Sequence, residues 1–246
     1  MFIYKAVVVG GGPGGYVAAI RAARSGARVA LVEKEKVGGT CLNRGCIPTK
    51  IMAETASILH ALKKAGDFGI AAGDVSFSLP GLMERKTRVV SRLVQGIEFL
   101  LKKNRVDYIR GKAKIAAPGT EMEYSTVPSC VYTHPEIGSV GMTEQEVMAK
   151  GLDFKTGKFP FMASGKAQAM GNTEGFVKII AESGSGRILG VHILGPRATD
   201  LIAEAAVVFS LGATAHKLVD IIHAHPTLSE ALVEAAEAVC GMSIHT

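Results

Sequence analysis

A glycine-rich turn close to the N-terminus constrains the fold of this sequence more than any other feature. Gly10, Gly12 and Gly15 form a G-x-G-x-x-G pattern that follows an apolar run over residues 5–9 and precedes Ala-rich helix formers over residues 16–25. A strand, a glycine turn and a helix in this order are typical of a dinucleotide-binding βαβ unit. The sequence therefore predicts an α/β domain with a parallel sheet, in which residues 5–9 form a buried strand.

Each glycine of this turn has an expected role. Gly10 permits the tight turn, Gly12 lets the backbone approach a pyrophosphate, and Gly15 lets the helix pack closely on the strand. Gly14 belongs to the same phosphate-binding turn, at the positive end of the helix dipole.

An acidic residue ends the next apolar run, which covers residues 28–32. Glu33 is placed to accept hydrogen bonds from the ribose of an adenosine, and Lys34 follows it directly. Together with the glycine turn, this position predicts dinucleotide binding, but it does not separate FAD from NAD.

The pattern along the chain predicts two domains of different class. In the first half we expect helices over residues 48–64 and 82–103 and a strand over residues 106–115, which gives a Rossmann-type α/β domain of residues 1–121. In the second half we expect an α+β domain of residues 122–246 with an antiparallel sheet, because residues 183–186 have the composition of a hairpin turn. Its expected elements are strands over 127–132, 154–161, 176–181 and 188–194, a helix over 143–150 with Thr143 and Glu146 as a capping box, and helices over 198–211 and 228–239.

Composition excludes several classes of protein. The chain has 28 Lys and Arg residues and 22 Asp and Glu residues, which gives a net charge of +6. Because the basic residues are scattered and only 6% of residues are aromatic, we expect no nucleic-acid partner. The apolar runs are shorter than the roughly 20 residues of a membrane-spanning helix. The N-terminus also lacks the apolar core of a signal peptide, so we expect a cytoplasmic protein without a membrane partner.

Two of the four cysteines lie close together in the segment 38–50. Five positions along one regular α-helix correspond to a rise of about 7.5 Å and a rotation of about 140°. A disulfide needs Cα atoms within roughly 4.4 to 6.8 Å. A bond between Cys41 and Cys46 therefore needs a looped turn outside regular helix, which Gly45 can supply. Cys46 would then lie at the N-terminus of the next helix, where the dipole favours a thiolate.

Two other interpretations of these cysteines exist: a pair of buried free thiols, or half of a zinc site. Cys130 and Cys240 are isolated in the sequence and provide no second ligand pair at motif spacing. We therefore expect no metal.

The segment 38–50, taken with the glycine turn upstream, resembles the FAD-linked pyridine nucleotide disulfide oxidoreductases, and within them the dihydrolipoamide dehydrogenases. This resemblance implies FAD at the glycine turn. It implies that Cys46 is the thiol nearest the flavin and forms a charge-transfer thiolate, and that Cys41 exchanges with substrate. It also implies that Gly39 and Thr40 hold the pyrophosphate and that Lys50 lies near the flavin. The alternative for Lys50 is an ordinary solvated lysine on a helix.

A histidine near the C-terminus is a candidate base for thiol exchange, because the thiolate is the nucleophile. His223 and His225 both lie there, and Glu230 could orient an imidazole. Thr227 and Glu230 equally fit a capping box for the last helix, which would engage Glu230 with backbone N–H groups. The residues alone leave these two interpretations open.

The resemblance favours His225 as the acid–base and Glu230 as its partner, with a cis His225–Pro226 bond, and it leaves His223 a structural role. In this family the histidine comes from the other subunit. The second half, from Val127 onward, also resembles the family's interface domain. A homodimer with a shared site is therefore implied, acting on a lipoamide-bearing acyltransferase or a small dithiol or disulfide.

Part of the family pattern is missing from this sequence. Between the two blocks, the family has a second G-x-G-x-x-G unit for NAD and a returning segment that completes the FAD site. Here residues 119–124 pass directly from one block to the other. Either the sequence joins two parts of a longer protein or the segment is deleted. We expect the former, because a deletion would expose apolar surface.

The expected activity is oxidation of dihydrolipoamide with electron transfer through the Cys41/Cys46 disulfide and FAD to NAD. A glutathione-reductase-like enzyme is the first alternative, and Leu42, Ile47 and Leu228 fit that group less well. A mercuric-reductase-like enzyme fits poorly, since the C-terminal segment holds one cysteine. A non-catalytic dimerisation remnant without flavin is the alternative from another class.

Overall fold

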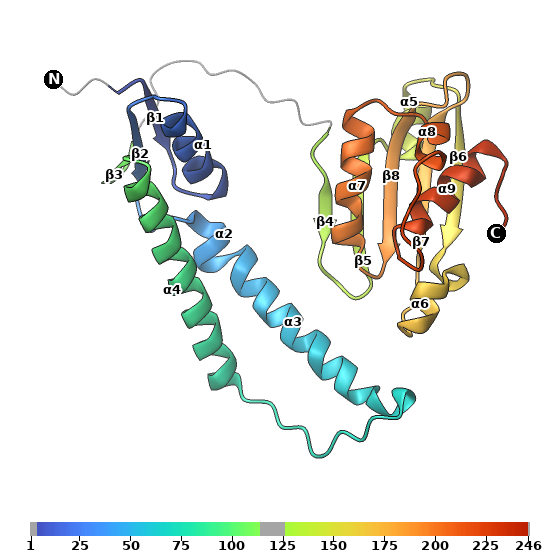
Figure 1. The fold of residues 1–246 in the computed structure, drawn as a ribbon, viewed down its shortest axis with the longest axis horizontal. Helices are drawn as coiled ribbons and strands as arrows, with labels where there is room; N and C mark the ends of the chain where they lie inside the picture. Colours follow the sequence, from blue (N-terminus) through green and yellow to red (C-terminus); the bar gives the residue numbers. More distant parts are fainter. Residues whose placement is uncertain (1–3, 114–125, 246) are drawn as a thin grey trace. The chain divides into compact units, whose positions relative to one another are not determined.

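The computed structural model describes residues 4–113 and 126–245 (Figure 1). The chain divides into two compact units, Met1–Pro118 and Gly119–Thr246, which we describe one at a time. This division and the predicted one at 121/122 both fall outside the described residues. No helix among the described residues is long and apolar enough to cross a membrane.

The first unit is an α/β fold around a three-stranded parallel sheet in the order β1-β2-β3, which confirms the predicted class. Its strands are β1 (Ala6–Val9), β2 (Val29–Glu33) and β3 (Asp107–Arg110). Its helices are α1 (Pro13–Arg24), α2 (Gly39–Arg44), α3 (Cys46–Lys63), the short 3-10 helix η1 (Ala65–Phe68) and α4 (Leu79–Lys103). In Figure 1, α3 and α4 run as two long helices beyond the sheet.

The prediction that the first strand is buried is wrong. β2 is the central strand and is almost completely buried, whereas β1 is an edge strand with Val7 and Val9 exposed by 55% and 45%. An edge strand contacts a neighbour on one side only, so its side chains are covered less than those of a central strand.

The core of the first unit ties the cysteine segment to the sheet. Leu42 of α2 packs in the same buried cluster as Val29 and Leu31 of β2 and Ile97 and Leu101 of α4. The helix α2 was not predicted, because Gly38 and Gly39 stand at its start and glycine disfavours helix. Burial of Leu42 outweighs that preference, since a buried leucine side chain contributes about 1.5 to 3 kcal/mol.

The second unit is an α+β fold around an antiparallel sheet, which confirms the predicted class. The sheet has five strands in the order β4-β5-β8-β7-β6, and the strand β5 was not predicted. Its strands are β4 (Ser129–Val131), β5 (Glu136–Gly141), β6 (Phe154–Pro160), β7 (Phe176–Glu182) and β8 (Ile188–Gly195). Its helices are α5 (Glu144–Ala149), η2 (Phe161–Ala163), α6 (Gly165–Ala169), α7 (Ala198–Ser210), α8 (Ala215–Val219) and α9 (Glu230–Cys240). The capping box predicted for Thr143 and Glu146 is present.

Helices cover both faces of this sheet. On one face, α7 packs over β5 and β8 and α9 over β6 and β7, around a large buried cluster that includes Phe161, Ile193, Ile202 and Leu232. On the other face, Val147 of α5 packs with Ile180 and Leu189. The second face is therefore covered only in part, around Ile180 of β7 and Leu189 of β8.

Candidate functional site

The glycine turn of the first unit has the geometry that its sequence predicts. Gly10 has a positive φ of 98°, which L side chains rarely adopt. A Cβ on Gly15 would lie 1.8 Å from the carbonyl oxygen of Gly10 and 3.6 Å from Val8. The close packing of α1 on the turn therefore requires glycine at position 15, and the packing role predicted for Gly15 is confirmed.

The N-terminus of α1 is open. Gly12 is its N-cap and provides no side-chain cap, and a Cβ on Gly12 or Gly14 would meet nothing within 4 Å. Gly39, whose φ is 57°, lies against this turn, since a Cβ there would come within 2.9 Å of the Gly12 Cα. Two glycine backbones thus meet at a helix N-terminus, where unpaired N–H groups and the helix dipole favour an anion.

Glu33 is buried at the end of β2, with 7% of its surface exposed. Its Oε2 accepts a hydrogen bond of 2.7 Å from the Gly11 N–H, and its Oε1 accepts one of 2.9 Å from the Glu35 N–H. Burial alone would raise the pKa of this carboxyl, but the N–H groups of Glu35, Gly11 and Lys34 hold the pKa below its ordinary value. Glu33 is therefore a carboxylate that fixes the glycine turn. Each oxygen has further capacity to accept a bond from a hydroxyl.

Sequence reasoning missed Gly11, which donates the bond that joins the glycine turn to Glu33. A Cβ on Gly11 would lie 3.1 to 3.3 Å from the Glu33 side chain. Position 11 is a variable position of the G-x-G-x-x-G pattern, so the pattern itself carried no signal for it. The Lys34 side chain is exposed beside this turn.

Cys41 and Cys46 lie on two consecutive helices, so the prediction that they lie outside regular helix is wrong. Cys41 is in α2 and Cys46 is the first residue of α3. The helical conformation is interrupted between them at Gly45, whose φ of −117° and ψ of −108° are not helical. A Cβ on Gly45 would come within 3.1 Å of the Thr40 carbonyl oxygen. The break thus provides the distortion that the five-residue spacing requires, without removing either cysteine from a helix.

The two cysteines are free thiols in this structure and interact with each other. A side-chain hydrogen bond with Cys46, and then burial, raise the pKa of Cys41 above its ordinary value. The positive charge of Lys50, one helical turn beyond Cys46 on α3, acts in the opposite direction. Cys41 is half-buried and Cys46 is exposed. Thr40 is exposed beside them. The sulfur–sulfur bond in the oxidised protein stays a prediction.

In the second unit, Glu230 pairs with His225 and also binds a backbone N–H, but it does so without the capping box that the sequence offered as an alternative. Its Oε1 lies 2.8 Å from Nδ1 of His225, and its Oε2 accepts a 2.7 Å bond from the Thr227 N–H. Thr227 does not cap the last helix: its hydroxyl donates to the Ala224 carbonyl, and Ser229 is the N-cap of α9. A carboxylate with two oxygens can orient an imidazole and bind a backbone N–H together.

The contacts of Glu230 explain its ionisation. Burial alone would raise its pKa, but the Thr227 N–H, the hydrogen bond with His225 and the charges of His225 and His223 hold the pKa below the ordinary value. The imidazole of His225 is 81% exposed, and no partner for its Nε2 is found within residues 126–245. The predicted cis bond between His225 and Pro226 is confirmed. The arrangement leaves one ring nitrogen free for proton exchange with a reactant.

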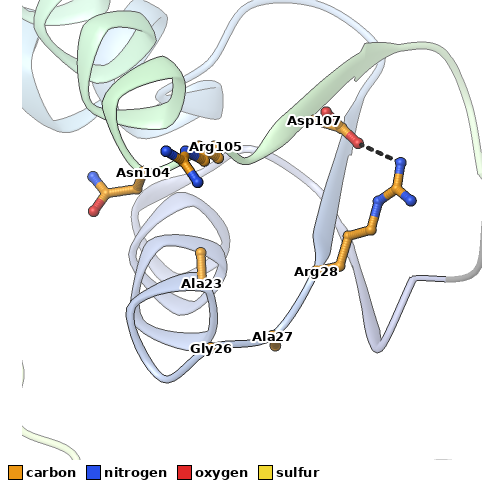
Figure 2. A pocket seen from close by; sticks show the side chains of 7 residues that line it. All are labelled: Ala23, Gly26, Ala27, Arg28, Asn104, Arg105 and Asp107. Atoms are coloured by element: carbon orange, nitrogen blue, oxygen red, sulfur yellow. Dashed lines mark ion pairs between the residues drawn. The ribbon is translucent and has the colours of Figure 1, made fainter.

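An open hollow of about 430 Å³ lies elsewhere in the first unit (Figure 2). Arg28 and Asp107 form an ion pair of 4.0 Å at its edge. The hollow lies between the C-terminal end of α1, the segment that leads into β2, and the connection from α4 to β3. Its lining residues are Ala23, Gly26, Ala27, Arg28, Asn104, Arg105 and Asp107. None of these residues belongs to the glycine turn or to the cysteine segment, so the hollow is not part of the candidate site.

The structure therefore assembles two groups of side chains. In the first unit, Cys41 interacts with Cys46 and Lys50, and Gly39 lies against Gly12. In the second, His225 pairs with Glu230. The first arrangement can exchange a thiol pair with a disulfide beside an anion-binding turn, and the second can accept a proton.

Family models match both units. Residues 4–129 match the model described as pyridine nucleotide-disulphide oxidoreductase, and residues 127–236 match the dimerisation domain of the same group. The two matches overlap at residues 127–129, beyond the division of the chain at 118/119.

Two relatives and one solved structure illustrate the similarity. The chain is 25% identical over 469 positions to dihydrolipoyl dehydrogenase of Bacillus subtilis, covering 98% of this chain and 99% of that one. It is 46% identical over 132 residues to dihydrolipoyl dehydrogenase of Halobacterium salinarum, covering 54% of this chain and 28% of that one. Its fold matches LpdA of Mycobacterium tuberculosis with a TM-score of 0.85 at 15% identity, covering 94% and 99% of the two chains.

The alignment with the Bacillus relative contains a large gap. It extends over 469 positions, whereas this chain has 246 residues, so nearly half of its positions have no residue here. The chain is therefore partial in comparison with that relative.

Proposed function

This chain belongs to the pyridine nucleotide-disulphide oxidoreductase family, and from that premise we propose that it takes two electrons from a dithiol through Cys41 and Cys46 and passes them to FAD. The observation that carries the proposal is the interaction of Cys41 with Cys46 at the break between α2 and α3, in the unit that also holds the glycine turn. The family implies FAD as the cofactor.

The residues at the glycine turn fit a dinucleotide. Gly12 would hold the pyrophosphate with its backbone N–H group at the open end of α1. Gly39 would contribute to the same site by its close approach to Gly12, since its own N–H donates to the Lys36 carbonyl oxygen. Glu33 would bind the adenosine ribose, Thr40 would help to hold the pyrophosphate, and Lys50 would lie near the flavin. When bound, FAD supplies a two-electron acceptor next to the cysteine pair.

The cysteine pair would react by thiol–disulfide exchange. One thiolate of the substrate attacks Cys41, forming a mixed disulfide and releasing Cys46 as a thiolate. The second substrate thiol loses its proton and displaces Cys41. The substrate leaves as a disulfide, Cys41 and Cys46 hold the two electrons, and two protons have been released. This order of roles rests on the family resemblance, since in this structure Cys46 is exposed and Cys41 is half-buried.

His225 would accept the proton from the substrate thiol. Its Nδ1 is held by Glu230, so its Nε2 is oriented as the reactive nitrogen. We propose that it acts on the cysteines of a second copy, in a homodimer with two-fold symmetry. The dimerisation-domain match supports this, as does exposed apolar surface in the second unit, where Val207, Leu211 and Ile222 are 59%, 77% and 98% exposed.

We propose dihydrolipoamide as the dithiol, carried on an acyltransferase or free, because the relatives named above are dihydrolipoyl dehydrogenases. NAD is proposed as the final acceptor for the whole protein. This sequence contains no second G-x-G-x-x-G, so no step to NAD is assigned to residues of this chain.

Anaerobic titration of the FAD-loaded protein tests the proposal. We expect dihydrolipoamide to bleach the flavin absorbance and reduced glutathione to leave it unchanged. The Cys46→Ser variant is expected to bind FAD but to resist bleaching, since it cannot form the disulfide. Equal bleaching of this variant would contradict the role of the cysteines. A protein that dimerises without binding FAD would instead be a non-catalytic dimerisation module.

The shared site has its own test. We expect neither His225→Gln nor Cys46→Ser to be reduced rapidly by dihydrolipoamide, whereas a mixed dimer has one site with both groups intact. Fast flavin reduction should therefore return when the two variants exchange subunits. If proven mixed dimers stay slow, His225 does not act on the partner's cysteines.

A further inference from the structure

A second histidine–carboxylate pair lies next to the His225–Glu230 pair. Nε2 of His223 is 2.6 Å from Oε1 of Glu204 on α7, and its Nδ1 is 2.9 Å from the Ile221 carbonyl oxygen. The His223 side chain is 10% exposed, whereas that of His225 is 81% exposed. The two histidines are two residues apart, but one is anchored inside the unit and the other points outward.

The partners of His223 determine its charge. A backbone carbonyl oxygen only accepts hydrogen bonds, so Nδ1 of His223 carries a proton. An ionised carboxylate also only accepts, so Nε2 carries a proton as well. A histidine with both nitrogens protonated is an imidazolium. Burial alone would lower the pKa of His223, but the bonds to Glu204 and to the Ile221 carbonyl and the charge of Glu230 raise it.

The two pairs act on each other through Glu230. The negative charge of Glu230 stabilises charged His223, and the positive charge of His223 stabilises ionised Glu230. The charged groups that act on His223 are thus Glu204 of α7 and Glu230 of α9. Those that act on Glu230 are His223 and His225, both from the segment between α8 and α9.

We propose that Glu204 and His223 are positioning residues for the acid–base pair: Glu204 anchors His223, and His223 holds the 221–225 segment fixed, so that His225 is presented in one orientation. Neither nitrogen of His223 is available to a reactant, because both are bonded within the unit. His223 therefore acts through Glu230 and His225. The role in catalysis rests on the proposed function of His225, but the electrostatic link does not.

Side-chain NMR titration of the intact 246-residue chain tests the proposal without any redox reaction. With ¹⁵N-labelled histidine and ¹³C-labelled glutamate, we expect His223 to show two protonated nitrogens at pH 7. In Glu204→Gln the titration midpoint of His223 should fall, because its carboxylate partner is lost. In His223→Gln the midpoint of Glu230 should rise, because a neighbouring positive charge is lost.

The chain provides a matched control on the same helix. His245 and Glu234 of α9 form another histidine–carboxylate pair, with Nδ1 2.7 Å from Oε1, and neither residue is among those that act on Glu230. His245→Gln should leave the titration of Glu230 unchanged. Glu204→Asp keeps the charge and should restore part of the His223 midpoint that Glu204→Gln loses.

Three results would overturn the inference. The first is a neutral His223 at pH 7 in the unmodified chain, which needs no variant and so does not depend on variant folding. The second is an unchanged Glu230 midpoint in folded His223→Gln. The third is an equal change in His245→Gln. Failure of the flavin bleaching experiment, with the NMR results as expected, would reject the proposed redox function and leave the positioning network intact.

Discussion

The two units of this molecule hold their functional groups by different means. In the first, the glycine turn is built from backbone: Gly10 and Gly39 have positive φ, Gly15 permits close contact with Gly10, and no side chain caps α1. In the second, side chains hold one another: Glu230 fixes His225, and Glu204 fixes His223. The proposed roles account for this difference: a turn that binds phosphates with N–H groups needs free backbone, whereas a proton acceptor needs a fixed tautomer, which a carboxylate supplies.

The two units also differ in the size of their buried apolar cores. The second unit has a large buried cluster between its sheet and α7, α8 and α9, with a further cluster at α5. The first has a smaller cluster and an edge strand with Val7 and Val9 exposed. The second unit therefore buries the larger apolar core.

We expect the largest loss of stability from a substitution at Gly15, where the backbone of α1 contacts the backbone of Gly10. Gly15→Ala places a Cβ 1.8 Å from the Gly10 carbonyl oxygen, so we expect the first unit to lose about 3 kcal/mol or more of unfolding free energy. Urea unfolding followed by hydrogen exchange over residues 4–113 measures this loss. The second unit should be unaffected.

Two neighbouring glycines provide controls for Gly15. A Cβ at Gly14 meets nothing within 4 Å, and Gly14 lies in α1, so Gly14→Ala should raise stability by about 0.5 to 1 kcal/mol. Gly12→Ala should leave the fold intact and weaken FAD binding. A Gly15→Ala protein as stable as the unmodified one would show that the turn is not fixed by this contact.

The next effect tests the core of the second unit. Leu232 is 1% exposed, so Leu232→Ala should destabilise this unit by about 3 kcal/mol through lost burial and a cavity. Met148→Ala, at a side chain that is 59% exposed on α5, should change stability by less than about 0.5 kcal/mol. Denaturant unfolding monitored by circular dichroism gives both values. Similar losses in both variants would mean that the buried cluster does not dominate stability.

The smallest effect concerns the pH dependence of Glu230. Its pKa lies below the ordinary value of 4.5 in the folded state, so its contacts contribute stability above about pH 4.5 that is lost as the pH falls through the folded-state pKa. The contribution of such a partly exposed pair is about 0.5 kcal/mol. The stability difference between the unmodified chain and Glu230→Gln should shrink in acid. Glu174→Gln, at an exposed position, is the control. If the stability difference between the unmodified chain and Glu230→Gln grows in acid, the pKa of Glu230 is raised and not lowered by folding.

Local patterns predicted much of this structure. The hairpin of β7 and β8 could be predicted because a Ser/Gly turn separates two apolar runs, and the cap of α5 because Thr143 and Glu146 have the spacing of a capping box. The glycine turn could be predicted because each glycine serves a local backbone need. These features depend on residues close in sequence.

The features that could not be predicted depend on partners distant in sequence. The helix α2 exists because Leu42 packs on β2 and α4, which overrides the poor helix propensity of its glycines. The edge position of β1 depends on which strands lie beside it, and apolar periodicity does not encode strand order. The pairing of His223 with Glu204 joins positions that no local motif connects.

Counting thiols tests the central claim that Cys41 and Cys46 form the redox pair. We expect the air-oxidised, denatured protein to show two reactive thiols, those of Cys130 and Cys240, and to show all four after reduction. In the oxidised, unmodified protein, peptide mapping should find Cys41 joined to Cys46. The Cys41→Ser variant should show the same number of thiols before and after reduction. Four reactive thiols before any reduction would contradict the account.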